Sequence, residues 1–413
     1  MKPPTVASLK KVTPENLARL GAERLAAIVA DAADSRPDLK RRLRMELAAE
    51  QGAEHLALEL DKRLNTLEGS RSKVSWRKRP SFVADLETLR GLIADRLAEL
   101  DPVAALARMW PFMDLARRLG TRVRDKDGGV AAIFDRAADD IGRLLGERHD
   151  ARAIDGLVDA ISRNPAAWAD WLPAALASAP KPALEMLLAR LRDRQGGSPG
   201  WAAILRQVAD AGGDVDAFLA TFTAQAIRTP AIAAEAAQRL LGAGRVEEAG
   251  QLLQAAGKAK PAEVDFEWET ALIDYLDAAG QAEAAQAARW ASFERTLSAE
   301  RARAFTRRLP DFEDVEAENR AFDHAARHPD AGRGLQFLMD WPAFPEAATM
   351  IEARADELQV SAEQAELWAG KLRARQPRAA HTLLRKTAAA AFRRRDFATC
   401  DRLTQEADTI ELP

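Results

Sequence analysis

Residues 233–257, AAEAAQRLLGAGRVEEAGQLLQAAG, decide the fold class of this chain. The spacing of the apolar residues predicts two antiparallel amphipathic helices. Gly242 and Gly244 stand between them, and we expect both to adopt the positive φ that ends a helix. Such a pair cannot bury both of its faces alone, so it must stack on similar neighbours. The apolar residues are Leu240 and Leu241 of the first helix and Val246, Ala249, Leu252 and Leu253 of the second.

The C-terminal half repeats this hairpin imperfectly. AGRVEEA ends at Ala249 and AGQAEAA ends at Ala285, 36 residues later, which is close to the period of about 34 residues of tetratricopeptide (TPR) units. WPAFPEA ends at Ala347 and RRRDFATC ends at Cys400, so the later offsets are unequal. The pattern predicts an all-α protein, an α-solenoid of antiparallel helix pairs that is TPR-like in its C-terminal half.

The composition and length agree with this fold class. Helix formers dominate, Tyr275 is the only tyrosine, and no stretch alternates β-branched with polar residues. A chain of 413 residues is too long for one ordinary core. We expect a flexible lead at 1–12, an N-terminal helical domain at 13–195 and a TPR-like helical repeat domain at 201–413, with the boundary near 196–200.

Several helix ends can be predicted from single residues in the N-terminal half. Thr13 is followed by Pro14 and Glu15, which predicts an N-cap and a helix that runs to about residue 33. Asp101 before Pro102 predicts another start. Ser81 is expected to cap the helix that follows the basic loop 69–80, and Pro111 is expected to kink or break its helix.

Charge and cysteine content exclude some functional classes. The chain has 60 Lys and Arg against 63 Asp and Glu, which argues against a nucleic-acid binder that is basic over its whole surface. A local patch remains open. Cys400 is the only cysteine, so neither an intrachain disulfide nor a cysteine-based zinc site can form. The N-terminus lacks an apolar signal region, and no apolar run reaches about 18 residues, so we expect a cytoplasmic protein without membrane contact.

Three segments between residues 291 and 342 carry a family resemblance: ASFERTLSAERARAF, RRLPDFEDVEAENRAFDHAARHPD and GLQFLMDWP. They resemble an uncharacterised family of bacterial helical proteins, a domain of unknown function. Related C-terminal regions accompany SWIM zinc fingers in some bacterial proteins. The similarity covers most of the chain, including SKVSWRKR at 72–79. The ligands of a SWIM finger are missing here, so the resemblance implies a helical fold and no metal-dependent activity.

The strongest charge feature is the loop 69–80, GSRSKVSWRKRP. Its cations can hold phosphates while Trp76 stacks on a base. Alternatively, the loop is solvated and Trp76 anchors it to the core. The short basic runs at 40–44 and 393–395 are expected to be exposed helix faces and helix C-termini. The residues of the candidate contact are Arg71, Lys73, Trp76, Arg77, Lys78 and Arg79.

Two further clusters are weaker candidates. His324 and His328 lie four residues apart on a predicted helix, so they can face one metal ion, but a histidine at a helix end is the simpler interpretation. A polar turn after a helix is a candidate groove rim, although its cations can equally serve the helix C-terminus. This rim comprises Arg307, Arg308, Asp311 and Phe312. The other tryptophans are expected to fill the core.

No catalytic signature occurs in the sequence, and no cofactor or metal is expected. The first functional hypothesis is therefore a non-enzymatic scaffold that presents a helical-repeat groove to a protein or peptide partner. The alternative is nucleic-acid binding through the basic loop 71–79. A third is an enzyme of unknown class whose site is assembled from distant carboxylates and histidines. The oligomeric state stays open.

Overall fold

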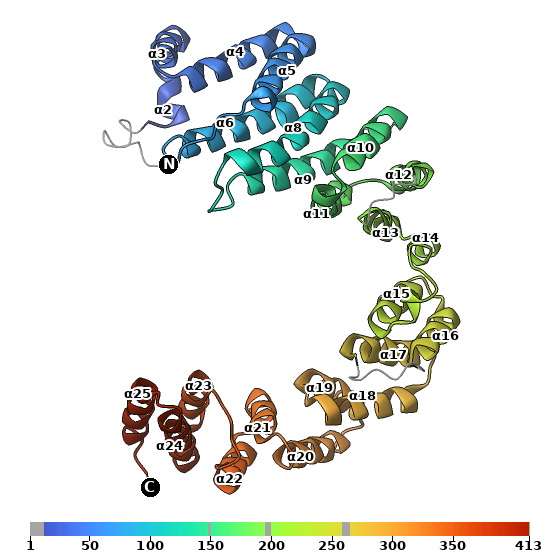
Figure 1. Ribbon diagram of the computed structural model, residues 1–413, viewed down its shortest axis with the longest axis vertical. Helices are drawn as coiled ribbons and strands as arrows, with labels where there is room; N and C mark the ends of the chain where they lie inside the picture. Colours follow the sequence, from blue (N-terminus) through green and yellow to red (C-terminus); the bar gives the residue numbers. More distant parts are fainter. Residues whose placement is uncertain (1–11, 148–149, 195–199, 258–264, 413) are drawn as a thin grey trace. The chain divides into compact units, whose positions relative to one another are not determined.

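The computed structural model describes residues 12–147, 150–194, 200–257 and 265–412, and every regular element in these ranges is a helix (Figure 1). The predicted all-α class is confirmed. The chain divides into two compact units between Thr223 and Ala224. This division lies C-terminal to the boundary predicted at 196–200, because α13 (Trp201–Gly212) packs against two helices that precede that stretch. The predicted lead lies outside the described residues except for Val12.

Unit 1 is built from short helices and one π-helical turn. Its elements are α2 (Pro14–Ala18), α3 (Ala22–Asp34), α4 (Pro37–Gln51), α5 (Ala53–Gly69), α6 (Arg79–Gly91), η1 (Leu92–Leu97), α7 (Ala98–Leu100), α8 (Pro102–Arg122), α9 (Ala131–Glu147), α10 (Ala151–Arg163), α11 (Pro165–Leu176), α12 (Lys181–Asp193), α13 and α14 (Val215–Leu219).

The helices of unit 1 lie in two rows. In one row α4 contacts α6, α6 contacts α9, α9 contacts α11 and α11 contacts α13. In the other row α5 contacts α8, α8 contacts α10 and α10 contacts α12. Consecutive helices alternate between the rows, so each pair buries its apolar faces against the pairs before and after it (Figure 1).

A chain of aromatic rings fills the middle of unit 1. Trp110 packs on Trp168 with ring centroids 6.3 Å apart, Trp168 packs on Trp171 at 5.8 Å, and Trp171 packs on Phe134 at 6.0 Å. The helix α8 runs unbroken through Pro111, so of the kink or break predicted there, the break is wrong. An internal proline costs about 3 kcal/mol. Burial of Trp110 and its large apolar neighbours on α8 offsets that cost, at about 1.5–3 kcal/mol for each side chain.

Local signals near the N-terminus were only partly predictive. The Thr13 side chain accepts from the Asn16 amide, which confirms the predicted cap. The helix expected to run to about residue 33 is instead interrupted at Gly21, where φ is 78°. The helix α6 begins at Arg79, so Ser81 lies inside its first turn and is not the N-cap. Its hydroxyl donates instead to the Lys78 carbonyl at 3.0 Å.

Unit 2 contains residues 233–257, whose apolar spacing predicts the helix pair. Its elements are η2 (Ala226–Arg228), α15 (Pro230–Gly242), α16 (Val246–Gly257), α17 (Phe266–Ala278), α18 (Ala282–Thr296), α19 (Ala299–Thr306), α20 (Glu313–Ala326), α21 (Ala331–Asp340), α22 (Phe344–Arg354), α23 (Ala362–Leu372), α24 (Pro377–Arg393) and α25 (Phe397–Asp408).

The predicted hairpins of unit 2 have the same type of turn between their two helices. After α15, the Arg245 amide donates to the Leu240 carbonyl at 2.8 Å, and after α17 the Gln281 amide donates to the Leu276 carbonyl at 2.9 Å. The same bond, spanning five residues, closes the turns before α22 and α25. Gly244 adopts φ 74°, as predicted, whereas Gly242 is the last residue of α15 and does not have a positive φ.

Candidate anion-binding pocket

The basic segment between α5 and α6 is fixed to the end of α8. The Val74 amide donates to the Arg122 carbonyl at 3.0 Å. The Arg122 guanidinium in turn donates to the Ser72 carbonyl at 3.0 Å, to the Leu67 carbonyl at 2.9 Å and to the Ser70 hydroxyl at 2.9 Å. These bonds satisfy the backbone at the C-terminus of α5, so one arginine from a distant helix holds the segment in place.

Trp76 does not anchor this segment. Its side chain is 75% exposed, and the Arg77 guanidinium lies over its ring at 5.2 Å from the centroid. The anchoring interpretation of Trp76 is therefore wrong. The backbone bond from Val74 to Arg122 and the Arg122 guanidinium hold the loop instead, and the indole is left on the surface with a cation beside it.

The six predicted contact residues separate into two groups. All of these residues except Arg79 are exposed; Lys73 and Lys78 line a cavity of about 390 Å³, whereas Arg71, Trp76 and Arg77 do not. Arg79 is engaged elsewhere, because it pairs with Asp127 at 2.7 Å and donates to the Arg124 carbonyl at 2.8 Å. The structure thus brings only two of the six residues to one cavity.

This cavity gathers side chains from α4, α5, α6, α8 and the basic segment. Five cationic side chains and two carboxylates line it, with four hydroxyl residues and an apolar wall. The cations are Arg41, Arg63, Lys73, Lys78 and Arg122; the carboxylates are Asp38 and Asp85; the hydroxyl residues are Thr66, Ser70, Ser72 and Ser81; and the wall is formed by Leu67, Val74 and Phe82.

The two carboxylates are already engaged. Arg41 and Arg63 both pair with Asp85, the former at 3.1 Å, so two guanidinium groups share one carboxylate. The Nε atoms of both arginines are buried and have no hydrogen-bond partner among the described residues. Asp38 pairs with Arg36 at 3.1 Å, and the hydrogen bond from Arg36 lowers the pKa of Asp38, which stays ionised. The cavity therefore keeps an excess of positive charge.

Sequence reasoning missed Arg41, Arg63 and Arg122. Arg41 belongs to the run 40–44, which was assigned to an exposed helix face, and the other two stand in ordinary helical surroundings. Their convergence depends on how α4, α5 and α8 pack, which no local pattern records. Only the absence of acids from the basic segment pointed toward this part of the molecule.

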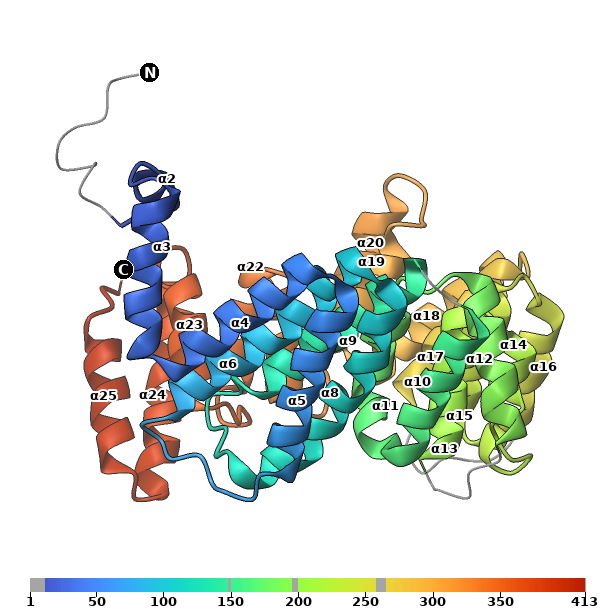
Figure 2. The same cartoon turned by 90° about the horizontal axis from the view of Figure 1, so that it is seen from above.

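The second predicted cluster forms the connection between α19 and α20. Arg307, Asp311 and Phe312 are exposed, Phe312 to 85%, and the connection projects beyond the neighbouring helices of its unit (Figure 2). Arg308 donates to the Ala304 carbonyl at 2.9 Å near the C-terminus of α19, which is the structural role that the sequence left open.

The histidine pair makes backbone contacts. His324 Nε2 lies 2.8 Å from the Glu294 carbonyl, and His328 Nδ1 lies 3.1 Å from backbone atoms of Asp330. Within the described residues, no group of three or more His, Cys, Asp or Glu side chains is placed to hold a metal ion. None of the described helices is long and apolar enough to span a bilayer.

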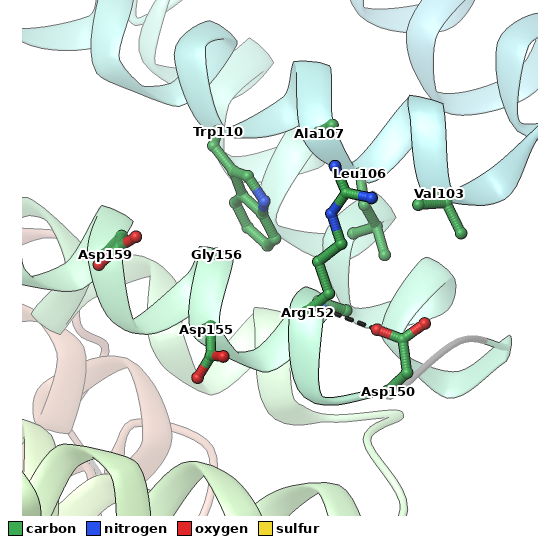
Figure 3. A pocket seen from close by; sticks show the side chains of 10 residues that line it. Val103, Leu106, Ala107, Trp110, Asp150, Arg152, Asp155, Gly156 and Asp159 are labelled. Carbon is green, nitrogen blue, oxygen red and sulfur yellow. Dashed lines mark hydrogen bonds between the residues drawn. The ribbon is translucent and has the colours of Figure 1, made fainter.

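A second cavity, of about 310 Å³, lies between α8 and α10 (Figure 3). Trp110, Leu106 and Val103 form its apolar wall. Its acids are engaged: Asp155 pairs with Arg190 at 3.1 Å, and Asp159 pairs with Arg194 at 2.5 Å. This cavity accordingly lacks the charge excess found at the basic segment.

Comparison with known proteins identifies the family to which the chain belongs. No curated protein matches the chain. The model of a family of unknown function (DUF6880) matches residues 7–166 and 189–399, so it covers most of both units and includes the basic segment. The chain therefore belongs to this family of unknown function, DUF6880.

Proposed function

We propose that the protein is a non-enzymatic α-solenoid scaffold, TPR-like in unit 2, that presents its surface to a protein or peptide partner. The observation that carries the proposal is the regular spacing of side-chain bonds between helix pairs. In unit 1, Arg108 donates to Asp61 at 2.8 Å, 47 residues away, and Arg163 donates to Asp114 at 2.9 Å, 49 residues away. Similar separations arise when successive helix pairs repeat one packing arrangement.

Unit 2 has the same regularity with a shorter period. Gln238 donates to Asp274 at 2.7 Å, and Arg402 donates to Glu366 at 2.7 Å, each across 36 residues. Arg303 donates to the Asp340 carbonyl at 3.0 Å across 37 residues. These separations are close to the period of about 34 residues of TPR units, which supports a TPR-like stack in this unit.

Exposed aromatic side chains support a surface that binds a partner. Phe392 and Phe397 are 60% and 55% exposed, and their rings pack edge to face at 5.7 Å on the turn between α24 and α25. Phe312 is exposed on its own connection. Large aromatic residues are enriched where protein interfaces hold most of their binding energy, so these positions are the first candidates for contact.

Chemical crosslinking during affinity purification from the native host tests the scaffold. A partner should crosslink to unit 2 near these phenylalanines, and the crosslinks should weaken in the Phe312→Ser variant or in the Phe392→Ser, Phe397→Ser double variant. Leu58→Ser, which changes an exposed residue of unit 1, is the control. Repeated recovery of the protein alone, or equal loss in the control, contradicts the proposal.

Nucleic-acid binding through the segment 71–79 remains the second candidate function, and the exposure of Trp76 favours it. An indole that is not packed into the core is free to stack on a base, while Arg77 and Arg71 meet the backbone phosphates. Fluorescence anisotropy with a single-stranded oligonucleotide lacking terminal phosphates should show binding that weakens steeply with salt. Trp76→Ala should reduce it and Trp76→Phe should retain most of it; an absence of binding at low salt contradicts this function.

A further inference from the structure

We infer that the cavity lined by Lys73, Lys78, Arg41 and Arg63 binds the phosphate group of a small phosphorylated molecule of about mononucleotide size. The inference is independent of the scaffold function, because it concerns an open cavity within unit 1. It also differs from the nucleic-acid alternative: Lys73 and Lys78 belong to both, but Trp76, Arg71 and Arg77, on which that alternative depends, lie outside the cavity.

The charge around the cavity is the first argument. Its lining holds five cations against two carboxylates, and Asp85 is shared between two arginines. No ion pair joins the ammonium group of Lys73 or Lys78 to an acid among the described residues. A dianionic phosphate would neutralise this excess, and charge pairs inside a concave site are screened less by salt than pairs on an open surface.

The hydrogen-bonding groups provide the second argument. The Ser70 hydroxyl accepts from Arg122, which leaves its own proton free to donate. Ser72 lies beside it on the same wall of the cavity. Hydroxyl and ammonium donors together match the several acceptor oxygens of a phosphate group. The Arg122 contacts fix the segment that carries these donors before any ligand arrives, which lowers the entropic cost of binding.

The size and the apolar wall define the ligand class. A volume of about 390 Å³ lies at the lower end of ordinary small-molecule sites. Leu67, Val74 and Phe82 offer an apolar surface that inorganic phosphate alone would leave uncovered. A phosphate monoester with a compact organic group, such as a mononucleotide, would use both the cations and this wall.

Titration calorimetry of the full chain at low ionic strength tests the site with AMP, inorganic phosphate and adenosine. AMP and phosphate should bind and adenosine should not. The Lys73→Ala, Lys78→Ala double variant should lower the affinity for AMP at least tenfold, because it removes two cations that make no ion pair with any residue that the structure describes. The Arg71→Ala, Arg77→Ala double variant is the matched control, since it removes equal charge from the same segment outside the cavity, and it should change the affinity less than threefold.

Each outcome decides the inference. Tighter binding of AMP than of phosphate supports the inference, whereas equal binding contradicts the mononucleotide-sized ligand and leaves a site for the phosphate group alone. Absence of binding by both ligands at millimolar concentration overturns the site, as does an equal loss of affinity in the two double variants. An unphosphorylated oligonucleotide that competes with AMP and depends on Trp76 would assign the segment to nucleic acid instead.

Discussion

At the scale of single residues, close approach between helices depends on glycines placed under large rings. Gly156 on α10 faces Trp110 on α8, and a Cβ built on this glycine would lie 2.5 Å from the indole Nε1. Gly120, also inside a helix, has no neighbouring atom within 4 Å of such a Cβ. Substitution by alanine at these two positions therefore distinguishes the effect of packing from the effect of helix propensity.

Gly156→Ala should destabilise unit 1 by about 1–3 kcal/mol, because the added methyl group overpacks a rigid ring. Gly120→Ala should stabilise it by up to about 1 kcal/mol, since alanine is the better helix former. Urea unfolding followed by far-UV circular dichroism measures both changes. Equal effects of the two substitutions would show that Trp110 does not pack on Gly156 as described.

Glu87 gives unit 1 a dependence on pH. Burial raises the pKa of Glu87, but its hydrogen bonds from Arg90 at 2.7 Å and Arg136 at 2.8 Å outweigh this effect, so the pKa lies below the usual 4.5. A lowered folded-state pKa stabilises the fold above the unfolded-state pKa, and this contribution is lost as the pH falls through the folded-state value.

The Glu87→Gln variant should therefore unfold at a lower temperature than the wild type at pH 7, and the difference should close as the pH falls below 4.5. Thermal unfolding across a pH series measures the gap. Asp139→Asn, which changes an exposed carboxylate on α9, is the control and should show a smaller gap. If the difference in unfolding temperature instead widens toward acid pH, the pKa of Glu87 is not lowered in the folded state.

At the scale of elements, the turns of unit 2 place one residue in the left-handed region. Gly280 has φ 71° and nothing within 4 Å of a built Cβ, and Arg395 has φ 62° in the corresponding turn. A residue with a Cβ pays about 1–2 kcal/mol in this region, and glycine does not. Both turns are closed by the same five-residue backbone hydrogen bond, but only the turn at Arg395 is strained.

Gly280→Ala should destabilise unit 2 by about 1 kcal/mol, and Arg395→Gly should leave it equally stable or stabilise it by a similar amount. Urea unfolding of both variants measures the opposite signs. Stabilisation by Gly280→Ala would mean that this turn does not adopt the left-handed conformation.

These elements also mark how far local sequence reasoning reaches. The Thr13 cap and the turn at Gly244 were predictable because the residues that define them are neighbours in sequence. The continuity of α8 through Pro111 was not, since it depends on burial against other helices. The cavity could not be predicted for the same reason: Arg41 and Arg122 lie far from the basic segment in sequence and reach it only through packing.

At the scale of the whole molecule, each unit has its own core. Trp168, Phe112 and Phe218 are fully buried in unit 1, and Phe293 and Phe337 are fully buried in unit 2. The boundary predicted at 196–200 was taken from a glycine-rich stretch, but the chain divides between Thr223 and Ala224. Such a stretch marks a flexible connection and does not show where packing stops.

Fragments 1–223 and 224–413 should each fold alone, because every compact unit with its own core can do so in principle. Each should give a helical circular dichroism spectrum and a cooperative thermal transition, and the intact chain should show both. Fragments cut at 195 should lose cooperativity, since α13 is then separated from α11 and α12. A folded 1–195 fragment as stable as 1–223 would contradict this division.

The exposure of Trp76 has an optical consequence. The other eight tryptophans are buried or half-buried, so their emission is shielded from aqueous iodide and shifted toward the blue. The indole at the basic segment emits at longer wavelength, and the surrounding cations concentrate the quenching anion beside it. Unlabelled protein thus carries an intrinsic fluorophore within its basic segment, and iodide quenching at the red edge of the spectrum reports mainly on that segment.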